Sequence, residues 1–273
     1  MQSEPGFYDD LDLYVTEAIR EGEPDRCLES MGSSGTPLIV AAAINGRLDL
    51  ADALFDAGAS MTANDLQQVV WWWGEGGTVA FLLDHGVPQN PACMYAALRH
   101  GRWEAVLALI DHGGDRETVV YPGETTFMPL PCGGTLSILH AAVWDGQVSV
   151  VQGLLQRGAD VDRCNATGVT PLMTACHVRK ADRRQRNPLI AYWLLKYGAD
   201  PNAVSPEGKT ALICCLEEQV EHFTIRTSIA QMLLRAGADP NVVTSAGHTP
   251  LMFAVRDNDT SLLRALQRAG ARR

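Results

Sequence analysis

The sequence lacks the features that mark a membrane or secreted protein. No stretch of its 273 residues approaches the roughly 18 consecutive apolar residues that a membrane helix needs. Its first residues carry neither the basic nor the apolar part of a secretion signal. The seven cysteines have no framework spacing, which favours reduced thiols over disulfides. We therefore expect a cytoplasmic protein, with the nucleus as the alternative location, and no membrane partner.

Motifs that carry catalytic chemistry are also missing. The sequence has no G-x-S-x-G, P-loop, H-E-x-x-H or paired C-x-x-C motif. Cys176 with His177, and Cys214 and Cys215 with His222, are potential metal ligands, but a zinc site needs four converging groups at defined spacing. Thiols packed in a core are the favoured interpretation. We predict a protein that is not an enzyme and has no small-molecule substrate, cofactor or metal.

Basic residues are scarce at the beginning of the chain. Residues 1–60 hold twelve Asp or Glu against three Arg, which is −9 of the formal net charge of −10. This imbalance disfavours nucleic acid as a partner. A basic run, "HVRKADRRQRN" at 177–187, could bind phosphate or an acidic partner. A solvated loop is the favoured interpretation of this run, because no aromatic residues interleave with the charges.

What the sequence has in abundance is internal repetition. Three segments beginning at Gly158, Gly198 and Gly237 share one pattern: "GADVDRCNATGVTPLMTA", "GADPNAVSPEGKTALICC" and "GADPNVVTSAGHTPLMFA". More divergent copies begin at Thr36, Tyr95 and Ser137. Short apolar segments with Leu-Leu pairs suit two short helices per unit, neither of which buries its apolar face alone. Stacking of neighbouring units then supplies the core.

These segments resemble the ankyrin repeat, a unit of about 33 residues in which a β-turn precedes two antiparallel helices and T-P-L-H-x-A opens the first helix. The resemblance is strongest at Thr170-Pro171-Leu172, at Thr249-Pro250-Leu251 and at 139–142, "LHAA". It implies an all-α solenoid of about seven and a half stacked helix-turn-helix repeats joined by β-turn loops. His140 occupies the histidine position of the repeat, for which a structural hydrogen bond is expected.

The glycine spacing sets the phase of the repeats. In most repeats a turn residue precedes the glycine that closes the helix pair by twelve positions, as in Gly46 and Gly58, and Asn258 replaces glycine before Gly270. The repeats closed by Gly198 and Gly237 depart from this spacing, because extra residues fall between their helices. The closing glycine is the left-handed residue that follows a helix. A Thr-Pro pair supplies the cap and the first-turn proline of the next helix. Asn202 and Asn241 are expected to form the turns between repeats.

We interpret residues 1–273 as a single ankyrin-repeat domain. Residues 1–35 read as a degenerate helix pair that caps the N-terminal end, and 249–273 as the C-terminal capping repeat. A long aperiodic loop at 114–134 interrupts the array. Its apolar residues either line the binding groove, engage a partner or fold back onto the repeats.

Three adjacent tryptophans, at 71–73, form the most unusual stretch of the chain. In ankyrin proteins the two residues before the turn between the helices face the concave groove and commonly contact the partner. The glycine spacing places four pairs there: Ile44 and Asn45, Trp72 and Trp73, Arg99 and His100, and Trp144 and Asp145, with Asp257 in the last repeat. Tryptophan and arginine are enriched in binding hot spots. The alternative for Trp72 and Trp73, and the favoured one for Trp71, is packing against the neighbouring repeat.

The resemblance therefore predicts a monomeric, non-enzymatic interaction module that binds a protein or an extended peptide in its concave groove. A rigid preformed groove loses little entropy on association. The alternative is the substrate-recognition subunit of a ubiquitin ligase, of the type in which ankyrin repeats precede a SOCS box. For that alternative we expect the adaptor-binding segment to be absent from this chain.

Overall fold

A computed structural model describes residues 30–31, 36–73, 75–117, 119–120, 136–177, 188–217 and 223–272. The described chain separates into two compact units, one with the described residues up to Asp115 and one that begins at Arg116. The predicted N-terminal cap, apart from residues 30 and 31, lies outside the described residues. So do the basic run at 178–187 and most of the predicted loop, 121–135. That all repeats form one domain stays a prediction.

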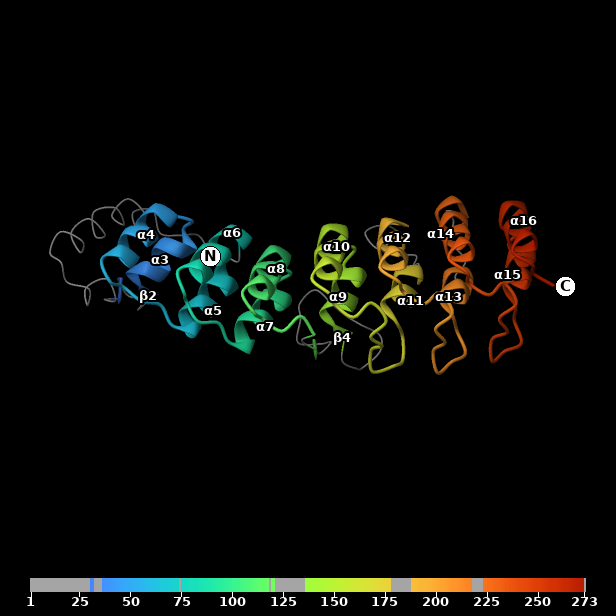
Figure 1. The fold of residues 1–273 in the computed structure, drawn as a ribbon, viewed down its shortest axis with the longest axis horizontal. Coiled ribbons are helices and arrows are strands. Elements are labelled where there is room, and N and C mark those ends of the chain that lie inside the picture. The colour runs from blue at the N-terminus through green and yellow to red at the C-terminus, as the bar shows by residue number, and fades with distance from the viewer. Residues whose placement is uncertain are drawn as a thin grey trace. The chain divides into compact units, whose positions relative to one another are not determined.

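Both units consist of paired α-helices (Figure 1). In unit 1 the helices are α3 (Leu38–Ile44), α4 (Leu48–Asp56), α5 (Ala63–Trp72), α6 (Gly76–Asp84), α7 (Pro91–Arg99) and α8 (Trp103–Asp111). In unit 2 they are α9 (Ile138–Trp144), α10 (Val148–Gln156), α11 (Pro171–Cys176), α12 (Pro188–Lys196), α13 (Ala211–Glu217), α14 (Phe223–Arg235), α15 (Pro250–Arg256) and α16 (Thr260–Arg268). These helix pairs confirm the predicted all-α repeat fold.

Two short antiparallel strand pairs precede the first helices of the two units. In unit 1, β1 (Ser30–Met31) pairs with β2 (Thr36–Pro37). In unit 2, β3 (Val119–Val120) pairs with β4 (Leu136–Ser137), with Val119 opposite Ser137 and Val120 opposite Leu136. The second pair joins the two ends of the predicted 114–134 loop region, so this segment leaves and returns at one place in unit 2.

Polar side chains cap the first turns of several helices. The Oγ1 of Thr62 accepts a hydrogen bond from the backbone N–H of Asp65, and the Asp65 carboxylate accepts one from the backbone N–H of Thr62. Thr170 caps α11 through the N–H of Met173, with Pro171 in the first turn. Each cap satisfies N–H groups that a helix start leaves without an intrahelical acceptor. The expected role of the Thr-Pro pairs is confirmed at Thr170 and Thr249. It is not found at Thr36, which lies in β2 and does not cap α3.

The predicted phase of the repeats is confirmed by the backbone. The closing glycines adopt positive φ, for example 94° at Gly58 and 93° at Gly270. Asn258 has a φ of 52° at the place where three other repeats carry Gly46, Gly101 and Gly146 with positive φ, and asparagine is the residue that best tolerates this conformation after glycine. These four turns therefore occupy the places that the twelve-residue spacing assigns to them.

The core lies between the stacked helices of each unit. First helices pack on first helices, α3 on α5 on α7 and α9 on α11 on α13 on α15, while second helices pack in the same order along α10, α12, α14 and α16. Leucines such as Leu54, Leu82 and Leu154 are fully buried at these contacts. Because each helix pair covers one side of the next, the apolar face of every pair is removed from water only by its neighbours.

Asparagine side chains connect successive repeats of unit 2. The Nδ2 of Asn202 donates to the carbonyl of Gly237 at 2.9 Å, and its Oδ1 accepts from the N–H of Asp239 at 2.8 Å. Asn241 repeats the arrangement with the carbonyl of Gly270 and the N–H of Arg272. The two amides thus perform the turn-forming role expected from the sequence.

A buried ion cluster fixes the last helices and was not predicted. The Arg226 side chain, on α14, is fully buried and donates to the carboxylate of Asp257 at 2.6 Å, with Asp259 3.7 Å away. Arg256 also contacts Asp257, at 2.7 Å. A buried cation needs such partners, because burial without them costs several kcal/mol. The glycine spacing predicted that Asp257 faces the groove. Its carboxylate instead forms ion pairs with Arg226 and Arg256 within unit 2.

The buried imidazole of His140 stabilises the first repeat of unit 2. Its Nε2–H donates to the carbonyl of Val169 at 2.9 Å, which leaves Nδ1 to accept from the Ser137 hydroxyl at 2.9 Å. Burial lowers the pKa of His140 from 6.5 to about 4. The imidazole is therefore neutral in the folded protein near pH 7, and its expected structural hydrogen bonds are present.

We expect acid to destabilise unit 2 through His140. Between about pH 6.5 and about pH 4 the unfolded chain binds a proton at this imidazole and the folded chain does not, so stability falls as pH falls, by about 2 kcal/mol at about pH 5. Urea unfolding of wild type and His140→Gln at pH 7 and 5 measures the difference. The variant should lose this part of the pH dependence, whereas His248→Gln, at an exposed imidazole, should keep it. Equal pH dependence in wild type and His140→Gln would contradict the assignment.

Candidate functional site

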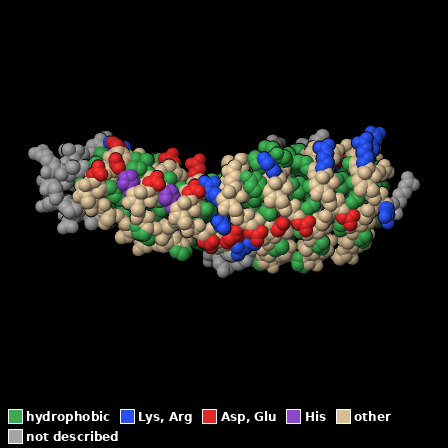
Figure 2. Space-filling view, viewed as in Figure 1, with side chains coloured by type: hydrophobic (Ala, Val, Ile, Leu, Met, Phe, Trp, Pro, Cys, Tyr) green, Lys and Arg blue, Asp and Glu red, His purple; other side chains and the backbone are tan. Residues whose placement is uncertain are grey.

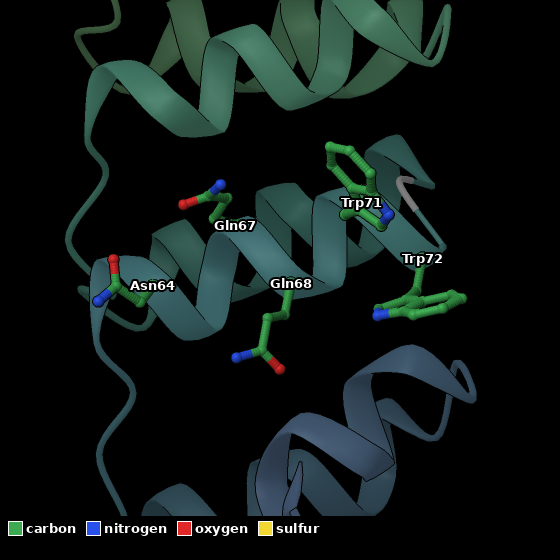
Figure 3. Close-up of a pocket in the computed structure, with 5 residues that line it drawn as sticks. All are labelled: Asn64, Gln67, Gln68, Trp71 and Trp72. Atoms are coloured by element: carbon green, nitrogen blue, oxygen red, sulfur yellow. The ribbon is translucent and has the colours of Figure 1, made fainter. Parts of the chain in front are cut away.

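The C-terminal end of α5 presents the three adjacent tryptophans in three different environments. Trp71 is half-buried, Trp72 is 61% exposed and Trp73 is 43% exposed. Successive residues of a helix are about 100° apart around its axis, so adjacent side chains leave the helix in different directions. Gln67 and Trp71 lie on the side of α7, and Gln68 and Trp72 on the side of α3 (Figure 3).

Trp71 packs against the end of the next first helix, α7. Its ring meets the His100 imidazole edge to face, with ring centroids 4.3 Å apart, and the Arg99 guanidinium carbon lies 5.5 Å from the ring centroid. Burial and the nearby Arg102 and Arg99 charges lower the pKa of His100. A neutral imidazole can pack as an aromatic ring. This contact fits the favoured interpretation of Trp71 as a packing residue.

Arg99 and His100 are therefore held against Trp71 rather than standing apart as independent groups. Both are half-buried, and Arg99 also donates to the Tyr95 hydroxyl at 3.3 Å. The Nε2 of His100 is buried and has no hydrogen-bond partner among the described residues. Trp71, Arg99 and His100 thus form one cluster between α5 and α7, and the predicted contact of Arg99 and His100 with a partner stays a prediction.

Trp72 and Trp73 extend from the turn between α5 and α6. The indole Nε1 of Trp73 donates to the Glu75 carboxylate at 3.0 Å, and Arg102 donates to the backbone carbonyl of Trp72 at 3.5 Å. These contacts restrain the turn while most of the Trp72 ring stays in water. An exposed indole on a restrained backbone loses little entropy when a partner covers it.

An open hollow of about 260 Å³ lies beside Trp71 and Trp72 on the surface of α5. Three amide side chains also line it: Asn64, Gln67 and Gln68 (Figure 3). Asn64, Gln68 and Trp72 are spaced four residues apart, so they share one face of the helix. These amides were not predicted from the sequence, although the spacing in "ANDLQQVVWW" is the signal that indicates them. Amides next to indoles can bind a peptide backbone and apolar side chains together.

The other predicted site residues end the corresponding helices. Ile44 is the last residue of α3, and Asn45 caps that helix through a hydrogen bond from Nδ2 to the carbonyl of Ala41 at 2.7 Å. Both are half-buried in unit 1, where α3 packs on α5. Trp144 and Asp145 end α9 in unit 2, and Asp145 accepts from Gln147 at 3.0 Å. A continuation of the site onto Trp144 and Asp145 stays a prediction.

The cysteines singled out from the sequence are core residues. Cys176, Cys214 and Cys215 are buried in α11 and α13. Burial raises the pKa of Cys214 and of Cys215 to about 12, so both carry thiols near pH 7 and not the thiolates that act as nucleophiles or metal ligands. Within the described ranges, no group of three or more His, Cys, Asp or Glu could hold a metal ion. No helix within those ranges is both long and apolar enough to span a bilayer.

The stacked helix pairs, their caps and their turns define the class: a helical repeat protein. Residues 139–227 match the family model of ankyrin repeats in three copies. Residues 139–227 are therefore ankyrin repeats, and the described helix pairs on either side of them have the same paired arrangement. The predicted family and fold class are confirmed, and ankyrin repeats make the protein a protein-interaction module.

Curated relatives match shorter segments of the chain. Protein phosphatase 1 regulatory subunit 27 of Mus musculus is 37% identical over 73 residues, 27% of this chain and 43% of the relative. The Homo sapiens protein of the same name is 36% identical over 73 residues. Ankyrin repeat and SAM domain-containing protein 6 of Danio rerio is 35% identical over 89 residues, 33% of this chain and 11% of the relative. The chain thus spans less than half the length of these relatives.

Substitution by alanine should separate the roles of Trp71 and Trp72. We expect Trp71→Ala to lower the free energy of unfolding by about 1–3 kcal/mol, because it removes the contacts with Arg99 and His100. We expect Trp72→Ala to change it by no more than about 0.5 kcal/mol, as is usual at an exposed position. Urea unfolding followed by circular dichroism measures both. Equal losses of stability in the two variants would show that Trp72 also belongs to the core.

Proposed function

We propose that the protein binds a partner protein through the first-helix face of unit 1, with Trp72 and Trp73 as the main contact residues. The observation that carries this proposal is the exposure of two adjacent indoles beside a hollow, on a turn restrained by Glu75 and Arg102. Exposed apolar side chains that gather at one place are typical of binding surfaces. Tryptophan is also among the residues most enriched in hot spots.

The energetic scale is sufficient for specific binding. An indole buries roughly 150–250 Å² when fully covered, and covering the exposed part of Trp72 gains roughly 2–4 kcal/mol at about 25 cal/mol/Å². Trp73 adds a smaller gain, because less of its ring is exposed. Association costs offset part of this sum. Two such anchors with the amides of Asn64, Gln67 and Gln68 suit an extended segment that offers both apolar side chains and backbone groups.

The relatives support a protein as the partner. Two of them are named as regulatory subunits of a protein phosphatase. The substrate-recognition role in a ubiquitin ligase, the alternative from the sequence, has no observation among the described residues that favours it. The monomeric state of the chain and its cytoplasmic location stay predictions.

The double variant Trp72→Ala, Trp73→Ala tests the proposed site. We expect it to fold as wild type does and to recover the main partner at least about tenfold less well, because the hot spot is removed. Affinity purification of the tagged full chain with quantitative mass spectrometry measures recovery, and circular dichroism measures folding.

The matched control is Val204→Ala, Val243→Ala, which truncates two similarly exposed apolar side chains in unit 2. It should recover the partner as wild type does. Undiminished recovery by the tryptophan variant would reject the site, and unfolding of that variant would place both rings in the core.

A further inference from the structure

Unit 2 carries one exposed basic residue at the same position of three successive second helices. Lys196 ends α12, Arg235 ends α14 and Arg268 ends α16, each two residues before the closing glycine of its repeat. We call these three residues the basic row. Because α12 packs on α14 and α14 packs on α16, the row runs across neighbouring helices. Figure 2 shows Lys and Arg side chains standing along this edge of unit 2.

The fold does not require a cation at this position. In unit 1 the residues two before the closing glycines are Asp56, Asp84 and Asp111, all exposed. A cation at a helix C-terminus is favourable and an anion is unfavourable. Since unit 1 forms the same helices with aspartate there, helix stability alone does not explain a row of one sign. The charge at this position is therefore negative in unit 1 and positive in unit 2 for a reason other than helix formation.

The two rows also differ in their partners. In unit 1, the His112 imidazole from the next second helix lies 2.9 Å from the Asp84 carboxylate. In unit 2, no carboxylate of the described residues lies within ion-pair distance of Arg235 or Arg268, and the row is extended by Arg264, exposed one turn before Arg268. A binding partner can therefore pair with Arg235 and Arg268 without breaking an existing ion pair.

An aromatic surface adjoins the row on α12. The exposed fractions of Leu189, Tyr192 and Tyr197 are 52%, 45% and 38%. The Lys196 ammonium lies 4.5 Å from the centroid of the Trp193 ring and 5.9 Å from that of Tyr192, so the first cation of the row is held against these rings. Exposed ion pairs contribute little individually, and the apolar side chains of α12 supply the burial that charges alone lack.

We propose that the basic row and the aromatic surface of α12 together bind an extended acidic segment of a partner protein. Helices in contact lie about 8–10 Å apart. A chain in the extended polyproline II conformation advances about 3.1 Å per residue with three residues per turn, so every third side chain lies on the same side, about 9 Å further along. Acidic residues at every third position of the segment therefore meet Lys196, Arg235 and Arg268 in register. An apolar residue at one end of the segment covers Leu189 and Tyr192.

The charge pattern favours a peptide over a nucleic acid. Asp160, Asp200 and Asp239 are exposed at the turns of the same unit, and acidic side chains gather below the basic edge in Figure 2. A nucleic-acid strand carries one phosphate per about 3.4 Å, so it has more negative charges per unit length than the row has cations. The carboxylates at the turns repel the phosphates that have no cation of the row to pair with.

Fluorescence anisotropy with the full chain and a defined probe tests the proposal. The probe is a fluorescein-labelled peptide with leucine at one end and glutamate at every third position among serines and alanines. We expect saturable binding that weakens as salt is raised, because the pairs are exposed. We expect Arg235→Glu, Arg268→Glu to weaken binding at least about tenfold. A peptide of the same composition with adjacent glutamates should bind more weakly than the spaced one.

The matched control is Arg116→Glu, Arg272→Glu, which changes the net charge of unit 2 equally at two exposed residues outside the row. It should bind the spaced peptide within about twofold of wild type, as should Trp72→Ala, Trp73→Ala, whose site lies in unit 1. Equal losses in both arginine variants, or none in Arg235→Glu, Arg268→Glu, would overturn the proposal. The proposal would also be overturned if a single-stranded oligonucleotide of equal charge bound more tightly than the spaced peptide and Arg235→Glu, Arg268→Glu abolished that binding.

Discussion

The structure depends on the burial of one apolar face per helix pair, which no pair can achieve alone. Leu54, Leu82, Leu154 and Leu233 reach zero exposure only because a neighbouring pair lies over them. This constraint fixes the register of the repeats, since a shift along the stack would uncover these side chains. The hydrogen bonds of Asn202 and Asn241 help to hold the same register at the surface, because each connects a turn to the next repeat. The surface that remains is free to vary in sequence.

Much of this surface could be predicted because turn geometry repeats. The twelve-residue spacing located the positive-φ turns, and with them the exposed positions of Trp72 and Trp73. This spacing is predictive because the closing glycine and the turn residue are required by the local backbone conformation, and glycine in the sequence marks the positions where φ is positive. The spacing predicts at which position of the repeat a residue lies. It does not predict which neighbours the side chain contacts. Arg99 and His100 illustrate this limit, since both are turned to Trp71 by an attraction between rings and charge.

Contacts between residues distant in sequence were the part that could not be predicted. Arg226 in "HFTIRTS" reads as a surface residue of an amphipathic helix, yet its guanidinium is buried against carboxylates that lie more than thirty positions away. No local pattern signals such a pair, because its charges come from different repeats. The hollow beside Trp72 was not predicted from the sequence for a different reason. Its amides follow a helical spacing, but three polar residues on a helix usually indicate only a solvated face.

The repeat architecture allows the two proposed binding surfaces to coexist in one chain. First helices present residues at the turn between the helices, where Trp72 and Trp73 lie, while second helices present residues before the closing glycine, where the basic row lies. The tryptophans lie on α5 in unit 1 and the basic row on α12, α14 and α16 in unit 2, so a substitution at one site leaves the packing at the other unchanged. Because the repeats fix position and leave side chains free, apolar anchors can be placed on one face and charges on another. In this chain the two chemistries occupy different helices, and each is therefore open to selection for its own partner.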